Sequence, residues 1–184
     1  LSTSTVDVED DQDPCIIAPG GGYRGLENRL YRVEIHDAGQ PGDDGGATFK
    51  WARHNASIAT AVTMIDGGTL TVASTGRDDV LRFNDGDWVE VIDDHLELAG
   101  QPGVMARVET VTDATRTIVL EAGVNLNAFA TTEDDHAARH TRIRRWDQAG
   151  TIADADGNEL LSVDDTGGVI PITADGATFR LEDG

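Results

Sequence analysis

Alternating hydrophobic and polar positions are the clearest pattern in the chain, and they are strongest in residues 30–36 and 47–53. In the first stretch Val33 and Ile35 would share one face of an extended strand, with polar residues on the other face. In the second stretch a phenylalanine and a tryptophan alternate with other residues in the same way. Residues 40–46 consist of glycine, proline, aspartate and glutamine, which predict a long loop. The two stretches therefore predict a β-hairpin with one buried face.

Similar alternation continues along the chain in short segments divided by turns. Residues 59–65 and 69–74 flank an Asp-Gly-Gly turn and predict a second hairpin. Residues 80–123 hold further strand-like segments separated by tight turns, and their cadence resembles that of SH3-like barrels. Residues 124–136 lack a clear period and predict a loop or a short helix, whereas residues 141–184 return to short strands.

These patterns predict an all-β fold: a β-sandwich or barrel with a small SH3-like β-barrel inserted into it or abutting it. In this prediction residues 23–75 and 139–184 form the main β domain. Residues 76–138 form the small barrel and the loop that follows it. Residues 1–22 are an acidic linker that leads into the first strand.

The charge of the chain narrows the classes of partner. The 184 residues carry a formal net charge of -20 at pH 7, with a pI near 4.3. This acidity argues against nucleic acid and anionic membrane surfaces, because both repel a strongly negative protein. Of the 14 basic residues only Lys50 is a lysine, a composition that resembles proteins of halophiles that accumulate salt.

The stability of such a protein is expected to depend on salt. At molar ionic strength the screening length is roughly 3 Å, so surface carboxylates no longer repel one another. At low salt the same repulsion destabilises the compact state. We therefore predict that the melting temperature falls when the protein is dialysed from molar salt into dilute buffer. Equal melting temperatures in the two buffers would contradict this prediction.

One basic cluster stands out against the acidic background. It comes shortly before and within a predicted strand that ends in a tryptophan. Nucleic acid would suit such a cluster, but the net charge opposes it. Because guanidinium groups bind carboxylates through two parallel hydrogen bonds, we predict that the cluster pairs with carboxylates of neighbouring strands or of a partner protein. The candidate interface comprises Arg139, Arg142, Arg144, Arg145 and Trp146.

Four oxygen-bearing side chains near the C-terminal end of the sequence have the spacing of a calcium loop. Asp154, Asp156 and Asn158 match the first three ligand positions, and Asp165 falls at the twelfth. The sixth position, which requires glycine, is Glu159, and the flanking residues predict strands instead of helices. A hairpin turn explains the same letters. We therefore predict no bound metal, with calcium as the alternative.

No catalytic arrangement is recognisable in the sequence. Acid–base side chains are present, but no serine or cysteine motif accompanies them to make a triad. His136 and His140 have a spacing that could hold zinc on a helix, but they lack the glutamate of H-E-x-x-H, and we predict a solvated loop. We therefore predict a protein that is not an enzyme and has no cofactor. The acid–base candidates are Glu34, His36, Asp37, His54, Asp94 and His95.

Six blocks follow one another in the sequence: Pro14–Ile17, Tyr23–His36, Ala47–Asn55, Gly86–Asp94, Arg144–Gln148 and Leu181–Gly184. In this order they resemble an uncharacterised family of large bacterial and archaeal proteins encoded near phage-tail-like contractile injection systems. Members of that family extend beyond this chain on both sides, so the resemblance implies an internal piece of a longer protein.

The resemblance implies a non-enzymatic structural or adaptor component of a tail-like assembly. Its partners would be protein subunits of that assembly, with homo-oligomers left open. The alternative is a module of a surface protein that binds glycan or cell envelope, which a groove of exposed aromatic residues would favour. The acidic composition implies a high-salt environment, either for a cytoplasmic assembly or for an extracellular particle.

Overall fold

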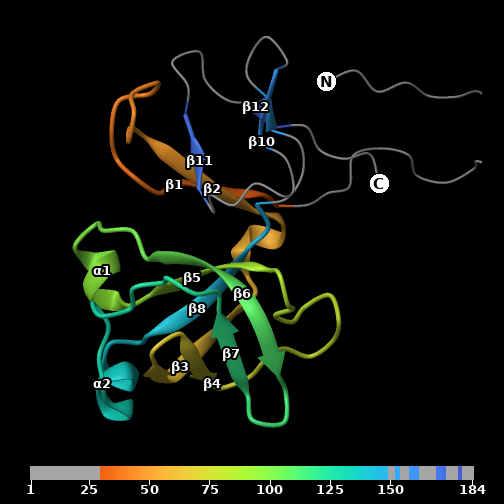
Figure 1. The fold of residues 1–184 in the computed structure, drawn as a ribbon, viewed down its shortest axis with the longest axis vertical. Coiled ribbons are helices and arrows are strands. Elements are labelled where there is room, and N and C mark those ends of the chain that lie inside the picture. Colours follow the sequence, from red (N-terminus) through yellow and green to blue (C-terminus); the bar gives the residue numbers. More distant parts are fainter. Residues whose placement is uncertain (1–29, 149–151, 154–157, 162–168, 173–177, 180–184) are drawn as a thin grey trace, which may run out of the picture.

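The computed structural model describes residues 30–148, 152–153, 158–161, 169–172 and 178–179 (Figure 1). Within these residues the chain consists mainly of β-strands, joined by short helices and loops. The prediction of an all-β fold is therefore confirmed. In the same ranges no helix is long and apolar enough to cross a membrane.

Six antiparallel strands close a barrel in the order β3-β4-β7-β6-β5-β8 (Figure 1). Every strand contributes aliphatic side chains to the barrel interior, as Val62, Val89 and Ile143 do from three of them. Removing these side chains from water is the main favourable contribution to the stability of the barrel. The strands are β3 (Ala59–Asp66), β4 (Thr69–Val72), β5 (Trp88–Ile92), β6 (Val104–Thr112), β7 (Thr117–Leu120) and β8 (Arg142–Trp146).

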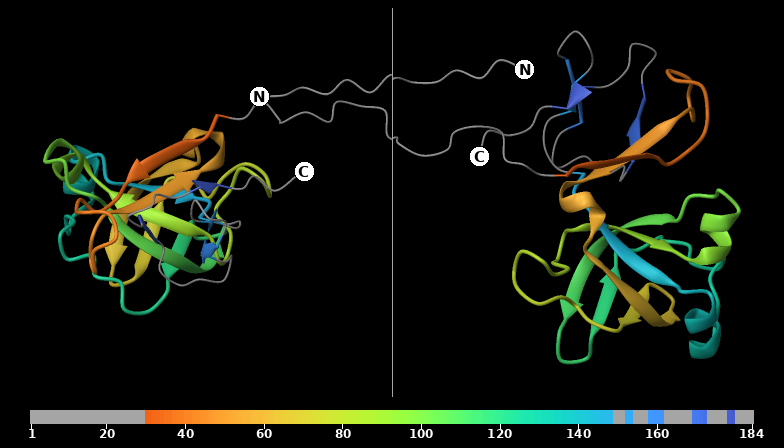
Figure 2. Two further views of the ribbon diagram at one scale, coloured as in Figure 1. Left: turned by 90° about the horizontal axis from the view of Figure 1, so that it is seen from above. Right: turned by 180° about the vertical axis from the view of Figure 1, so that it is seen from behind.

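A second sheet, in the order β1-β2-β11, lies against the outside of the barrel (Figures 1 and 2). The predicted hairpin is present in it, with Val33 opposite Trp51 and Ile35 opposite Phe49. Phe49, Trp51 and Ile170 form a small separate core. The strands are β1 (Arg32–Ile35), β2 (Thr48–Ala52) and β11 (Ile170–Pro171). A third sheet, in the order β10-β9-β12, contains β9 (Ile152–Ala153), β10 (Glu159–Leu161) and β12 (Thr178–Phe179).

The barrel is larger than the small barrel predicted from the sequence. β3, β4 and β8 were predicted to lie in the main domain. Instead β4 pairs with β7 and β8 pairs with β5, and β3 closes the barrel by pairing with β4 and β8. The second sheet keeps only β1, β2 and β11. Alternation along a strand shows which face is buried but not which strand pairs with it, so the predicted boundaries at residues 75 and 139 cut through the barrel.

Short helices begin where side chains cap them. α1 (Asp94–Leu98) follows Asp93, whose carboxylate accepts a hydrogen bond from a backbone N–H of the first turn. α2 (Glu133–Ala138) follows Thr132, whose hydroxyl does the same. Each cap satisfies an N–H that has no partner within the helix. The 3-10 helix η1 (Arg53–Ala56) connects β2 to the barrel.

Candidate functional site

The predicted arginine cluster forms ion pairs within the chain. Arg142 lies 2.9 Å from a carboxylate oxygen of Asp94 and also binds the carboxylate of Glu97. Arg139 lies 3.4 Å from a carboxylate oxygen of Asp93. These three carboxylates belong to α1 and its cap, so the arginines attach this helix to β8 and to the end of α2. Hydrogen bonds from His140 and from Arg142 lower the pKa of Asp94.

The two central arginines of β8 differ in their partners. Arg145 donates a hydrogen bond to the backbone carbonyl of Arg82 at 2.6 Å and lies 3.7 Å from a carboxylate oxygen of Asp87. Burial raises the pKa of Asp87, and the nearby guanidinium partly opposes this rise. The side chain of Arg144 has no hydrogen bond or ion pair within the described residues. It is therefore the member of the predicted interface whose charge is available to a partner.

Trp146 does not lie at the surface, contrary to its place in the predicted interface. Its side chain is only 1% exposed, and its indole N–H donates to a carboxylate oxygen of Glu90 at 3.0 Å. The reason is that β2 of the second sheet covers this end of β8, so a position on the outside of the barrel is buried. Trp146 supports the junction between sheet and barrel instead of a partner surface.

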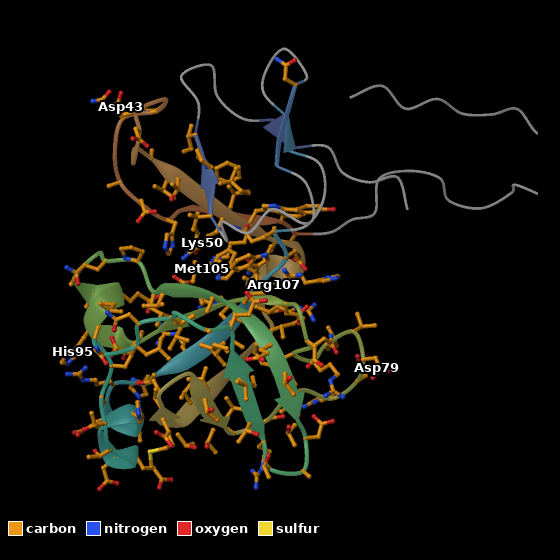
Figure 3. All side chains as sticks on the ribbon, viewed as in Figure 1. Asp43, Lys50, Asp79, His95, Met105 and Arg107 are labelled. Carbon is orange, nitrogen blue, oxygen red and sulfur yellow. The ribbon has the colours of Figure 1, made fainter. Side chains whose placement is uncertain are left out.

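A buried and fully paired ion pair lies at this junction between the second sheet and the barrel. Lys50 of β2 is 3% exposed and Glu90 of β5 is 0% exposed, and their side chains form a salt bridge. The backbone N–H of Gly103 donates to the same carboxylate at 3.0 Å, and the Lys50 ammonium lies 4.7 Å from the ring centroid of Trp146. A carboxylate oxygen of Glu34 lies 3.6 Å from the ammonium. Figure 3 shows Lys50 at the boundary between the second sheet and the barrel.

These contacts give the junction a structural role. Both oxygens of Glu90 are used, one by Lys50 and Gly103 and the other by Trp146. A fully paired buried carboxylate avoids the cost of desolvation without a partner. This cluster is not predicted from the sequence, because Glu90 alternates with valines as a solvent-facing residue would. The one signal was that Lys50 is the sole lysine of the sequence.

A groove of about 410 Å³ lies between α2 and β3. Much of its wall consists of small side chains such as Ala61 and Ala137, and His136 and Thr141 also line it. His136 is 0% exposed, so the prediction of a solvated loop was wrong for this residue. Its Nδ1 lies 3.2 Å from the hydroxyl of Thr141, and its Nε2 is buried without a hydrogen-bond partner among the described residues.

The stability of the fold is expected to decrease in mild acid because of His136. Burial lowers the pKa of His136 below the ordinary value of 6.5, and the charge of Arg139 acts in the same direction. The unfolded chain then binds the proton more readily, so the contribution is complete above pH 6.5 and is lost as the pH falls towards the folded pKa. Chemical denaturation at pH 7.5 and 5.5 should give a smaller pH-dependent loss for His136→Asn than for the wild type. Equal losses would contradict this assignment.

The other predicted candidates are dispersed. His140 is exposed and its Nδ1 lies 2.6 Å from a carboxylate oxygen of Asp94. Burial, and then the charge of Lys50, lower the pKa of His36, while His54 and His95 are exposed. Within the described part of the chain no three metal-ligating side chains come together. Of the calcium candidates, Asn158 is exposed and precedes β10, whereas Asp154, Asp156 and Asp165 lie outside the described residues.

β1 presents an unusual set of exposed apolar side chains. Leu30, just before the strand, is 66% exposed, and Val33 and Ile35 are 51% and 59% exposed. Val33 and Ile35 lie on the same face as Phe49 and Trp51, their cross-strand neighbours, which are buried. The apolar surface of this sheet therefore continues from its small core to the solvent-exposed border strand.

Comparisons with known proteins give one match. A model of a single protein family matches residues 1–184 of the chain. Neither the curated proteins nor the solved structures contain a match.

Proposed function

The chain belongs to the family of unknown function DUF6519, and on this premise we propose that it is a non-enzymatic structural or adaptor module that binds protein subunits of a phage-tail-like contractile injection assembly. The observation that carries the proposal is the exposed apolar face formed by Val33 and Ile35, with a further exposed side chain, Leu30, just before the strand. Single exposed hydrophobic residues are common, but several adjoining ones next to an apolar core are typical of protein-binding surfaces.

The buried junction supports an adaptor role. An adaptor must hold its binding surfaces in a fixed relation, and the Lys50–Glu90 pair joins the sheet that carries β1 to the barrel. Arg144 offers a second surface, on the outside of the barrel, with a guanidinium that no carboxylate of the described residues pairs. Arginine is enriched in protein interfaces because its fork of donors binds carboxylates and backbone carbonyls.

The proposal of a tail-like assembly rests on the family resemblance of the six sequence blocks. A glycan-binding module, the second candidate, would need aromatic rings gathered in an open groove. Trp51 and Trp146 are buried and Trp88 is half-buried, which favours the subunit-binding proposal over the glycan-binding one.

The proposal is tested by purifying the affinity-tagged protein from its host at the native salt concentration. Electron microscopy and mass spectrometry of the eluate are expected to show sheath, tube or baseplate subunits, or visible tails. An Arg144→Glu variant tests the second surface: it should retain the fold and lose part of the bound material. A protein that elutes alone, or with envelope glycans, would contradict the proposal and favour the glycan-binding alternative.

A further inference from the structure

The border strand of the second sheet has an open backbone edge. β1 pairs with β2 on one side, and Figure 2 shows it at the border of the sheet. The N–H of His36 donates to the carbonyl of Thr48 at 2.8 Å, which makes these residues a hydrogen-bonded pair. Because such pairs alternate along an antiparallel ladder, the N–H and C=O groups of Val33 and Ile35 point away from β2. Within the described residues they have no hydrogen-bond partner.

The side chains beside this edge are suited to an added strand. Val33 and Ile35 expose more than half of their surface on one face of the sheet. On the opposite face Arg32 and Glu34 already bind each other, and Glu34 also approaches Lys50. β1 contains neither lysine nor proline, and its two charged side chains lie on the face opposite Val33 and Ile35. An added strand with apolar residues at alternate positions would bury Val33 and Ile35 as it pairs with their backbone.

The negative charge of the chain narrows the class of partner. The loop that follows β1 carries the exposed carboxylates Asp43 and Asp44, the first of which is labelled in Figure 3. A second copy of this chain would bring the same carboxylates and a further charge of -20. Electrostatic complementarity therefore favours a segment with lysine or arginine next to its apolar positions.

We propose that the free edge of β1 is a docking site for an extended segment of another protein, apolar at alternate positions and basic at its ends, which adds to the sheet as a strand. The inference rests on the proposed function, since it specifies the chemistry of the subunit that the adaptor binds. β1 has four residues, so the added strand is short and the surrounding side chains supply the rest of the affinity.

The probe is a blocked seven-residue peptide of alternating valine and serine with a lysine at each end. It is titrated into the isotopically labelled chain, and amide exchange is followed by NMR. The amides of Val33 and Ile35 should exchange at least tenfold more slowly when the peptide is bound. Ile35→Pro removes the outward N–H but no bond to β2, and should weaken peptide binding at least tenfold. Ile35→Lys, which keeps all backbone groups and adds a repelling charge, should weaken it similarly.

The controls separate strand addition from nonspecific adhesion. Val80 is exposed on a loop of the barrel, and Val80→Ser should leave peptide binding unchanged. The same peptide with N-methylated valines cannot form the ladder and should not bind. Unchanged exchange of the two amides at about 1 mM peptide, a level that would exclude even weak binding, would overturn the proposal. Self-association that Ile35→Lys abolishes would also overturn it, by identifying a second copy as the occupant.

Failure of the β1 docking site can be distinguished from failure of the proposed assembly role. If Ile35→Pro and Ile35→Lys still co-purify with tail subunits from the host, the assembly role stands and the β1 docking site falls. If the peptide binds at β1 but the host protein elutes without tail subunits, the docking site stands and the assembly role falls.

Discussion

Replacement of Lys50 with methionine should lower the free energy of unfolding by about 3–5 kcal/mol, the usual cost of removing one partner from a buried ion pair. Methionine preserves most of the volume of the side chain, so the main loss is the charge. The carboxylate of Glu90 would then stay fully buried with only the N–H groups of Gly103 and Trp146 to stabilise it. Because the pair joins β2 to β5, the second sheet should also be less firmly attached to the barrel.

Urea denaturation of the wild type and three variants tests this expectation. Glu90→Gln combined with Lys50→Met removes both charges and should recover at least half of the lost stability, since an amide oxygen can still accept a hydrogen bond. Arg107→Met is the matched control, because Arg107 lies 4.0 Å from a carboxylate oxygen of Glu121 in a half-exposed pair. Such a pair contributes under about 1 kcal/mol. A loss in Lys50→Met no larger than in Arg107→Met would refute the role of the buried pair.

The same cluster shows how far the sequence predicts this structure. The hairpin of β1 and β2 was predicted because alternation and turn composition are local properties of the chain. The Lys50–Glu90 contact joins residues 40 positions apart, and the contact of Trp146 with Glu90 spans 56 positions. A strand covered on both faces usually reads as a continuous hydrophobic run, and Glu90 interrupts that run in β5 as a solvent-facing residue would. Trp146 was therefore placed at the surface, and Glu90 was not predicted to be buried.

Strand pairing was the other feature that could not be predicted from the sequence. Alternation along each barrel strand predicts which side chains face inward. In the structure β8 lies between β3 and β5, which come from distant parts of the chain. Nothing in the alternation of β8 specifies these neighbours. α1 was missed because a helix of five residues is shorter than the repeat needed to recognise it, although Asp93 is a typical cap. The basic character of β8 did predict pairing with carboxylates of neighbouring strands or of a partner. Arg142 and Arg145 do pair with carboxylates, but these belong to α1 and to the residue before β5.

Replacement of Gly103 with alanine should destabilise the fold by about 3 kcal/mol, the upper part of the range for overpacking a close-packed interior. A Cβ atom at this position would lie 2.5 Å from the carbonyl oxygen of Val91 and 2.6 Å from Cγ of Glu90. Neither neighbour can move freely, because the carbonyl of Val91 is part of the backbone of β5 and the side chain of Glu90 is held by Lys50. The substitution would also displace the N–H that Gly103 donates to the Glu90 carboxylate.

Gly68→Ala is the matched control for this prediction, measured by thermal and urea denaturation under the same conditions. Its Cβ would meet only the carbonyl oxygen of Leu120, at an ordinary contact distance of 3.5 Å. Alanine there should change the stability by less than about 1 kcal/mol, because it reduces the freedom of the unfolded chain without a clash. If Gly103→Ala is as stable as Gly68→Ala, β6 must be able to move away from β5. Glu90 would then not be held in one position, and the junction could not fix the second sheet against the barrel.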